Sequence, residues 1–253
     1  MLTIRPEQMA VFADASVSRF ERRMLGHIAE YFPAHYEIVG EQALRATIRL
    51  GVERGQAYGL TTQRDLYHYV PLMLLLGSYF DEDPQLPWAA AILKDEAVSD
   101  PGARAERLYD EAMAYLDAVA GEEGELLLAA LKRLRERPVA QVWQPGSENV
   151  QTRVAGLLRE VWPQKARRVG ADALAQVARC AAQAARDYDV PGDLGIAVFA
   201  TLMFMLGSGF SADPQFPWAA EILNDRSPEG RQRKAERLHE AGMKLADQWL
   251  ARA

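Results

Sequence analysis

The sequence repeats itself at a fixed spacing of 130 residues. The clearest part of the repeat is residues 72–95, which match residues 202–225 at 16 of 24 positions. Over the longer alignment of residues 23–117 with residues 153–247, 32 of 95 positions are identical without a gap. Self-similarity at one period indicates a repeated structural unit, here of about 100 residues. We therefore predict a tandem duplication.

Within each copy the apolar residues recur at helical spacing. Residues 20–31 are apolar at positions 20, 24, 25, 28 and 31, which places these side chains on one face of a helix. No stretch alternates β-branched and polar residues, so we predict no strands. The expected helices of the first copy span residues 20–31, 41–58, 63–80, 87–94 and 101–118. The second copy repeats this order, and one more helix, residues 122–137, joins the two.

The predicted fold is all-α, a tandem duplication of a four- to five-helix unit packed as two pseudo-symmetric helical bundles. We expect a first helical repeat unit at residues 1–120, a helical spacer at 121–145 and a second repeat unit at 146–253. Thr61 or Thr62 can cap the helix that follows, because a hydroxyl there accepts from an unpaired amide. Pro87 suits the first position of a helix, where its missing N–H costs nothing.

The amino-acid composition excludes several classes of protein. The chain is 49% hydrophobic and 25% charged, which is typical of a folded globular protein rather than a disordered one. Its net charge is −6 and its basic residues are dispersed, so we expect no nucleic-acid partner. Cys180 is the only cysteine, which excludes an internal disulfide. Residues 1–12 hold no apolar stretch suited to a secretory signal, and we expect a cytoplasmic protein.

The excess negative charge lies in the first copy. Residues 15–120 contain 10 basic and 16 acidic residues, a net charge of −6, whereas residues 145–250 contain 13 of each. An acidic surface attracts basic partners and speeds their association. This difference favours a protein partner for the first copy, although solubility alone would also explain it.

The most apolar segment is residues 194–212, which carry no charge over 19 residues. An apolar helix of about 20 residues can span a bilayer. Its counterpart, residues 66–80, is shorter and contains His68 and Pro71. Because related segments should share one environment, we expect both to be central helices buried in their bundles, and we expect no membrane partner.

No pattern of a catalytic site is present. The histidines His27, His35, His68 and His239 lack a two-ligand spacing, and one cysteine leaves no cysteine–histidine zinc set. Glycine-rich phosphate loops and a nucleophile elbow are also absent. We therefore predict no catalytic residue, no metal ligand and no cofactor.

One acidic cluster could suit a hard cation, which prefers several oxygen ligands. In the first copy it consists of Asp81, Glu82, Asp83 and Asp95. The second copy keeps only Asp213 and Asp225. Turn formation before proline and termination of a helix explain the retained aspartates more simply.

The most specific shared feature is the segment Asp-Pro-Gln-x-Pro-Trp at residues 83–88 and 213–218. Its tryptophan could line a groove for a ligand or partner. Alternatively, the two prolines set the path of a corner and the tryptophan fills the bundle, a fold requirement that both copies would keep. The candidate partner-binding residues are Asp83, Gln85, Trp88, Asp213, Gln215 and Trp218.

Several segments of the first copy carry a resemblance to a known family. They are Met1–Met9 (MLTIRPEQM), Arg19–Met24 (RFERRM), Tyr58–Thr61 (YGLT) and Asp83–Ala89 (DPQLPWA). With them the sequence resembles uncharacterised helical bacterial proteins that are often encoded beside type VI secretion spike and effector genes. The resemblance covers mainly residues 1–120, implies an accessory role and supplies no catalytic residues.

Together these observations predict a non-catalytic accessory factor of type VI secretion. It would bind a secreted effector, or a spike component, as an adaptor or chaperone. The alternative is an immunity protein that neutralises a cognate toxin, and an acidic first copy would suit a basic toxin. Two further alternatives are a membrane-active helical protein and an enzyme with an unrecognised site.

Overall fold

The computed structural model describes residues 6–136 and 149–252. Those residues form twelve α-helices and two short 3-10 helices, without a strand in either range, which confirms the predicted all-α class. Residues 1–5 and residues 137–145 of the predicted spacer lie outside the described part of the chain.

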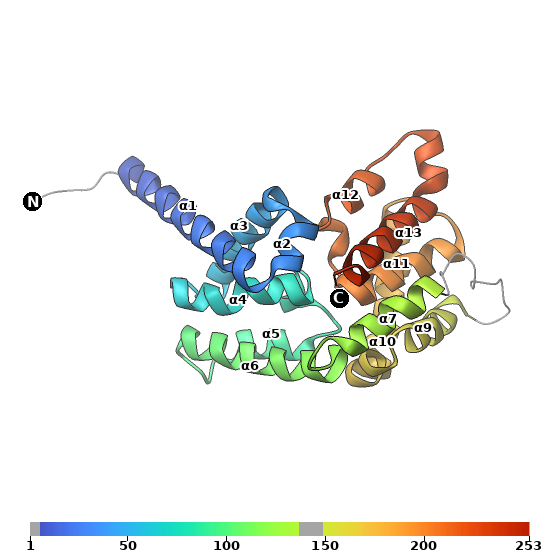
Figure 1. Ribbon diagram of the computed structural model, residues 1–253, viewed down its shortest axis with the longest axis horizontal. Coiled ribbons are helices and arrows are strands. Elements are labelled where there is room, and N and C mark those ends of the chain that lie inside the picture. Colours follow the sequence, from blue (N-terminus) through green and yellow to red (C-terminus); the bar gives the residue numbers. More distant parts are fainter. Residues whose placement is uncertain (1–5, 137–148, 253) are drawn as a thin grey trace, which may run out of the picture.

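The first half of the chain is built around one central helix. Its elements are α1 (Pro6–Tyr31), α2 (Pro33–Val39), α3 (Glu41–Ala57), α4 (Gln63–Leu76), η1 (Phe80–Glu82), α5 (Pro87–Leu93) and α6 (Pro101–Ala120). In Figure 1 these helices lie on the left, with α4 between α1 and α6. The next helix, α7 (Glu125–Glu136), packs against the second half of the molecule.

The second half follows the same order of helices. Its elements are α9 (Val150–Val161), α10 (Pro163–Asp187), α11 (Gly192–Leu206), η2 (Phe210–Ala212), α12 (Pro217–Leu223) and α13 (Pro228–Leu250). Helix α7 lies alongside α13 and also contacts α9 (Figure 1). None of the helices in the described ranges is long and apolar enough to cross a membrane.

Caps and glycines set the helix ends. The hydroxyl of Thr62 accepts from the N–H of Asp65, and the Asp65 carboxylate accepts from the N–H of Thr62, so α4 begins with a capping box. Gly77 ends α4 at a φ of 94°, and Gly207 ends α11 at a φ of 97°, a conformation that favours glycine. The helix predicted over residues 63–80 therefore stops at residue 76.

Both halves bend at a matching glycine. Gly40 separates α2 from α3 at φ 82° and ψ 151°, and Gly170 bends α10 at φ 85° and ψ 171°. Pro33 lies in the first turn of α2, directly after α1 ends at Tyr31. The first helix begins at Pro6, well before the predicted residue 20, because the prediction followed only the apolar positions from 20 to 31.

Two hydrophobic cores meet on α4. The smaller core lies between α1, α3 and α4, and the larger one extends from α4 through α5, α6 and α7 into the second half. Leu66 and Val70 of α4 face the smaller core, whereas Leu72 and Met73 face the larger one. A largely apolar helix needs neighbours on several sides, and α4 packs against α1, α3 and α6.

Candidate functional site

The shared Asp-Pro-Gln segments lie where the two halves of the molecule meet. The carboxylate of Asp213 accepts from the backbone N–H of Ser78 at 2.7 Å and from its hydroxyl at 2.6 Å. In the opposite direction, the carboxylate of Asp83 accepts from the N–H and the hydroxyl of Ser208, both at 2.7 Å. Each half thus supplies an aspartate that binds the residue just beyond the central helix of the other half.

The glutamines of the segments repeat this exchange. Nε2 of Gln85 donates to the carbonyl of Met203 at 2.9 Å, and Nε2 of Gln215 donates to the carbonyl of Met73 at 2.8 Å. Each carbonyl also accepts from the N–H of the glycine that ends its helix, Met73 from Gly77 at 3.1 Å and Met203 from Gly207 at 3.0 Å. The glutamine of each half therefore adds a second hydrogen bond to the helix end of the other half.

The two helix ends touch through their glycines. A Cβ on Gly77 would lie 2.5 Å from the carbonyl oxygen of Leu206, and one on Gly207 would lie 2.9 Å from that of Leu76. Neither position has room for a side chain. Burial raises the pKa of Asp213 at this junction, an effect that the hydrogen bonds from Ser78 oppose.

The polar candidate residues from the sequence are enclosed here. Their exposed fractions are 5% for Asp83, 2% for Gln85, 4% for Asp213 and 4% for Gln215. The structure brings all four together and uses their polar atoms to join the halves. In this arrangement a partner could not reach them unless the halves separated.

The two candidate tryptophans lie beside the junction and pack against the larger core. The ring of Trp88 is 5.9 Å from that of Tyr115, and the ring of Trp218 is 6.1 Å from that of Phe216. The indole nitrogen of Trp88 and the hydroxyl of Tyr115 are buried without a hydrogen-bond partner in the structure. Both tryptophans are half-buried, and they pack α5 and α12 against the larger core.

Lys165, which sequence analysis did not single out, is buried near Asp83. Its ammonium donates to the carbonyl of Phe204 at 2.5 Å and lies 5.0 Å from the ring centres of both Trp162 and Phe204. Burial lowers its pKa to about 8, against the attraction of Asp83. Its position in the first turn of a helix gave no signal, because surface lysines occur there as well.

The matching position of the first half holds His35. Its ring hydrogen-bonds to the backbone of Leu74, the residue that matches Phe204, and lies 4.4 Å from the ring of Trp249. Burial lowers the pKa of His35 to about 4. Both halves therefore hold a basic side chain against the central helix at the same place, with different titration ranges.

The first half also buries an ion pair that the second half lacks. Arg54 donates to Asp81 at 2.7 Å and 3.2 Å, and the hydroxyl of Tyr69 donates to the same carboxylate at 2.9 Å. The second half has Ala184, Phe199 and Ser211 at the matching positions. Asp81 is fully buried and bound by these two side chains.

The four acidic residues considered as cation ligands, Asp81, Glu82, Asp83 and Asp95, bind different protein groups instead. Asp95 pairs with Arg107 at 3.0 Å, as the matching Asp225 pairs with Arg237 at 2.6 Å. Within the described ranges no group of three or more histidine, cysteine, aspartate or glutamate side chains is placed to hold a metal ion.

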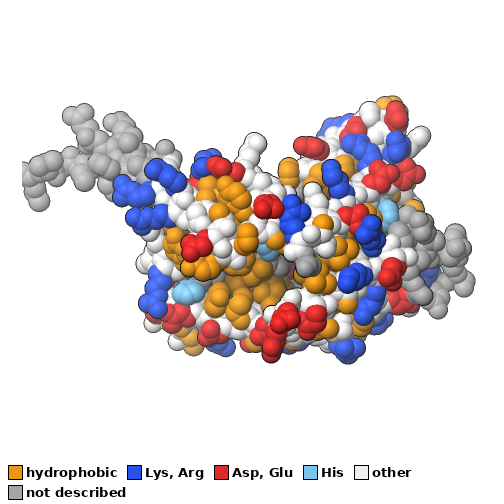
Figure 2. Space-filling model, viewed as in Figure 1, with side chains coloured by type: hydrophobic (Ala, Val, Ile, Leu, Met, Phe, Trp, Pro, Cys, Tyr) orange, Lys and Arg blue, Asp and Glu red, His pale blue; other side chains and the backbone are white. Residues whose placement is uncertain are grey.

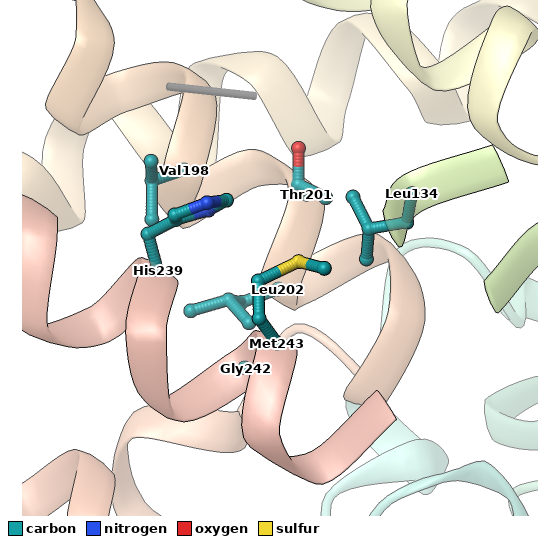
Figure 3. A pocket seen from close by; sticks show the side chains of 7 residues that line it. All are labelled: Leu134, Val198, Thr201, Leu202, His239, Gly242 and Met243. Atoms are coloured by element: carbon teal, nitrogen blue, oxygen red, sulfur yellow. The ribbon is translucent and has the colours of Figure 1, made fainter. Parts of the chain in front are cut away.

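Helix α7 covers one face of the second half. Leu134 of α7 lines a small pocket together with Leu202 of α11 and Met243 of α13, as Figure 3 shows. His239 of α13 lines the same pocket, and burial lowers its pKa. Arg135 of α7 forms an ion pair with Asp247 of α13 at 3.0 Å. Apolar and charged contacts together hold this helix in place.

Within the described ranges no further helix contacts both α1 and α6 as α7 contacts both α9 and α13, and we name this matching face of the first half the open face. We define it by six exposed or partly exposed residues of the matching helices: Tyr31 of α1, His68 and Leu75 of α4, and Tyr109, Met113 and Leu116 of α6. Figure 2 shows hydrophobic side chains gathered over α4 here, between α1 and α6. Tyr31 is 63% exposed, whereas Val161, its match in α9, is 5% exposed.

Sequence analysis missed the open face because the face is defined by the lack of a covering helix in the described ranges. No sequence motif indicates that a helix is missing from a surface. No protein-family model, curated protein or solved structure matches the chain.

Proposed function

We propose that this protein is a non-catalytic accessory factor that binds another protein through its first half. The observation that carries the proposal is the open face, with Tyr31 63% exposed where its match Val161 is 5% exposed. Exposed apolar surface that is bordered by polar residues is typical of protein interaction sites. The retained residues Asp83, Gln85, Asp213 and Gln215 are occupied in joining the halves, so the binding surface is sought elsewhere.

We also propose that the chain is a tandem duplication whose two units pack pseudo-symmetrically. The reciprocal hydrogen bonds of Asp83 with Ser208 and of Asp213 with Ser78 support it. The matching bends at Gly40 and Gly170 support it as well. Under this proposal the second unit is covered by α7 and stabilises the first unit through the junction. The open face of the first unit remains available to a partner.

For the biological setting we propose type VI secretion in the bacterial cytoplasm, on the resemblance carried by residues 1–120. The partner would be a secreted effector or a spike component, and the protein would act as its adaptor or chaperone. Deleting the gene should then keep the neighbouring effector inside the cell while the rest of the apparatus still fires. The measurement is the amount of effector and of spike protein in the culture medium.

Complementation connects this phenotype to the open face. Wild-type protein and Ala118→Glu should restore effector secretion, because Ala118 is exposed and a separation of five residues places it about 140° around α6 from Met113. Met113→Glu should not restore it, although the variant protein accumulates to the same level. Normal effector delivery in the deletion strain would contradict the adaptor role.

One observation favours an immunity protein as the second candidate. The net charge of residues 15–120 is −6, from 10 basic and 16 acidic residues, which suits a basic toxin. In that case deletion would leave secretion unchanged and make the cells sensitive to toxin from neighbouring cells. Protection without any effect on secretion would replace the adaptor by the inhibitor.

A further inference from the structure

The seat of α7 on the second half indicates what the open face accepts. Helix α7 contacts α9 and α13, and its Leu134 packs beside Leu202 and Met243. The elements that hold α7 match first-half elements in chain order: α9 matches α1, α11 matches α4 and α13 matches α6. The same three elements therefore border the open face.

The side chains at the matching positions are also suited to an apolar helix. Met243, which lines the pocket beside α7, corresponds to the partly exposed Met113 in the first half, whereas the match of Leu202 is the fully buried Leu72. Val198 and His239 correspond to His68 and Tyr109, whose rings lie 5.5 Å apart. The open face thus offers an aromatic and aliphatic surface where the second half holds a leucine of α7.

The charge at the border of the open face is conserved between the halves. Asp247, which pairs with Arg135 of α7, matches Asp117 of α6. Asp117 is exposed, and within the described ranges its carboxylate has no ion pair. An arginine or lysine on an incoming helix would find at Asp117 the partner that Arg135 finds at Asp247.

We infer that the open face binds an amphipathic helix of a partner protein, with leucines at three- and four-residue spacing and a basic residue that pairs with Asp117. The inference rests on the proposed function, that the protein binds another protein. A second copy of this chain is a less suitable occupant, because its α7 is already seated on its own second half.

The test uses α7 itself as the probe. A fluorescent peptide of residues 125–136, capped at both ends, is titrated with the full-length protein and followed by fluorescence anisotropy. We expect saturable binding with a Kd of about 10–100 µM, weak because a short isolated helix must first order itself. Met113→Glu should weaken binding at least tenfold, and Ala118→Glu on the same helix should change it less than twofold.

A charge exchange tests the position of the basic residue. Asp117→Arg should weaken binding of the original peptide several-fold, and a peptide with Arg135→Glu should recover most of that loss on the Asp117→Arg protein. Absence of saturation up to about 1 mM, or binding that ignores Met113→Glu and Asp117→Arg, would overturn the inference. Dimerisation through an exchanged α7 would overturn it too.

These outcomes are separable from failure of the proposed function. If the protein binds its secretion partner but neither Met113→Glu nor Asp117→Arg affects that complex, the open face is not the docking site, and of the proposed function only the binding of a secretion partner stands. If the peptide binds as expected but no effector or spike component does, the proposed function fails.

Discussion

The two halves of the molecule bury different side chains around their central helices, α4 in the first half and α11 in the second. The first half encloses the charged pair Arg54–Asp81 beside α4, whereas the second half has alanine and serine at those positions beside α11. The first half leaves Tyr31 exposed, whereas the second half encloses the matching Val161. Two segments that they share, Gly-Ser and Asp-Pro-Gln, lie where they meet. The comparison teaches that these retained segments hold the halves together, whereas the residues that differ at Arg54, Asp81 and Tyr31 distinguish the two halves.

The largest effect should come from a methyl group placed between the halves. Gly77→Ala would put a Cβ 2.5 Å from the carbonyl oxygen of Leu206, in a backbone conformation with a φ of 94°. We expect a loss of about 4 kcal/mol in the free energy of unfolding, from strain and overpacking together. Urea denaturation measures it.

Gly40→Ala is the matched control for this prediction. Gly40 has a similar φ of 82°, but a Cβ there would meet nothing within 4 Å. The control should therefore cost only the backbone strain, about 2 kcal/mol. Equal losses for the two variants would show that the contact between the halves adds nothing.

The second-largest loss of stability should come from breaking the buried ion pair Arg54–Asp81, which the second half lacks. Asp81→Ser should lower the free energy of unfolding by about 3 kcal/mol, because Arg54 loses its buried partner and the Tyr69 hydroxyl loses its acceptor. Thermal and urea denaturation would measure this loss.

The triple variant Arg54→Ala, Tyr69→Phe and Asp81→Ser gives the first half the residues of the second. It should recover to within about 1 kcal/mol of the wild type, since an apolar replacement removes the unpaired charge. A triple variant less stable than Asp81→Ser would contradict this account.

The third effect depends on pH and concerns Lys165. Its pKa is about 8 in the folded protein and 10.5 ordinarily, so the unfolded chain binds the proton more tightly and stability rises with pH between these values. The stability advantage of Lys165→Met over the wild type should shrink by about 2 kcal/mol from pH 7 to pH 9.5. Urea denaturation at both pH values checks this.

His35 supplies the comparison at the matching position. Its pKa falls from 6.5 to about 4, so the wild type should lose stability relative to His35→Leu as the pH falls from 6.5 to 4. A pH-independent difference for either variant would show that the side chain is not enclosed as described.

The smallest effect tests the open face. Tyr31→Ser should change the free energy of unfolding by less than about 0.5 kcal/mol, because the side chain is 63% exposed. Val161→Ser at the matching position should cost about 2 kcal/mol, because that side chain is 5% exposed. A large loss for Tyr31→Ser would mean that the first half is covered as the second is.

Much of the helical pattern could be predicted because its signals are local. The helix expected at residues 101–118 is α6 at 101–120, and the one expected at 122–137 is α7 at 125–136. Residues 87–94 correspond to α5 at 87–93. The error at residues 77–80 arose from following apolar residues past Gly77, although glycine is a common helix end.

The candidate residues show where local signals stop. The retained Asp83 and Gln85 were recognisable as a shared motif, but the partner of Asp83 in the other half, Ser208, lies 125 residues away. Nothing adjacent to Asp83 in the chain indicates that pairing. Lys165 and the open face were missed for the same reason, since burial and exposure depend on which helices pack over them.

The sequence by itself determined the all-helical class, most helix positions and the 130-residue repeat, because periodicity, caps and identities are properties of neighbouring or aligned residues. Only the tertiary structure decided that the shared aspartates join the halves, that Lys165 is enclosed and that α7 covers one half. All three features depend on contacts between segments that are distant in the sequence. Such contacts are stabilised by the removal of side chains from solvent, which the local sequence does not specify.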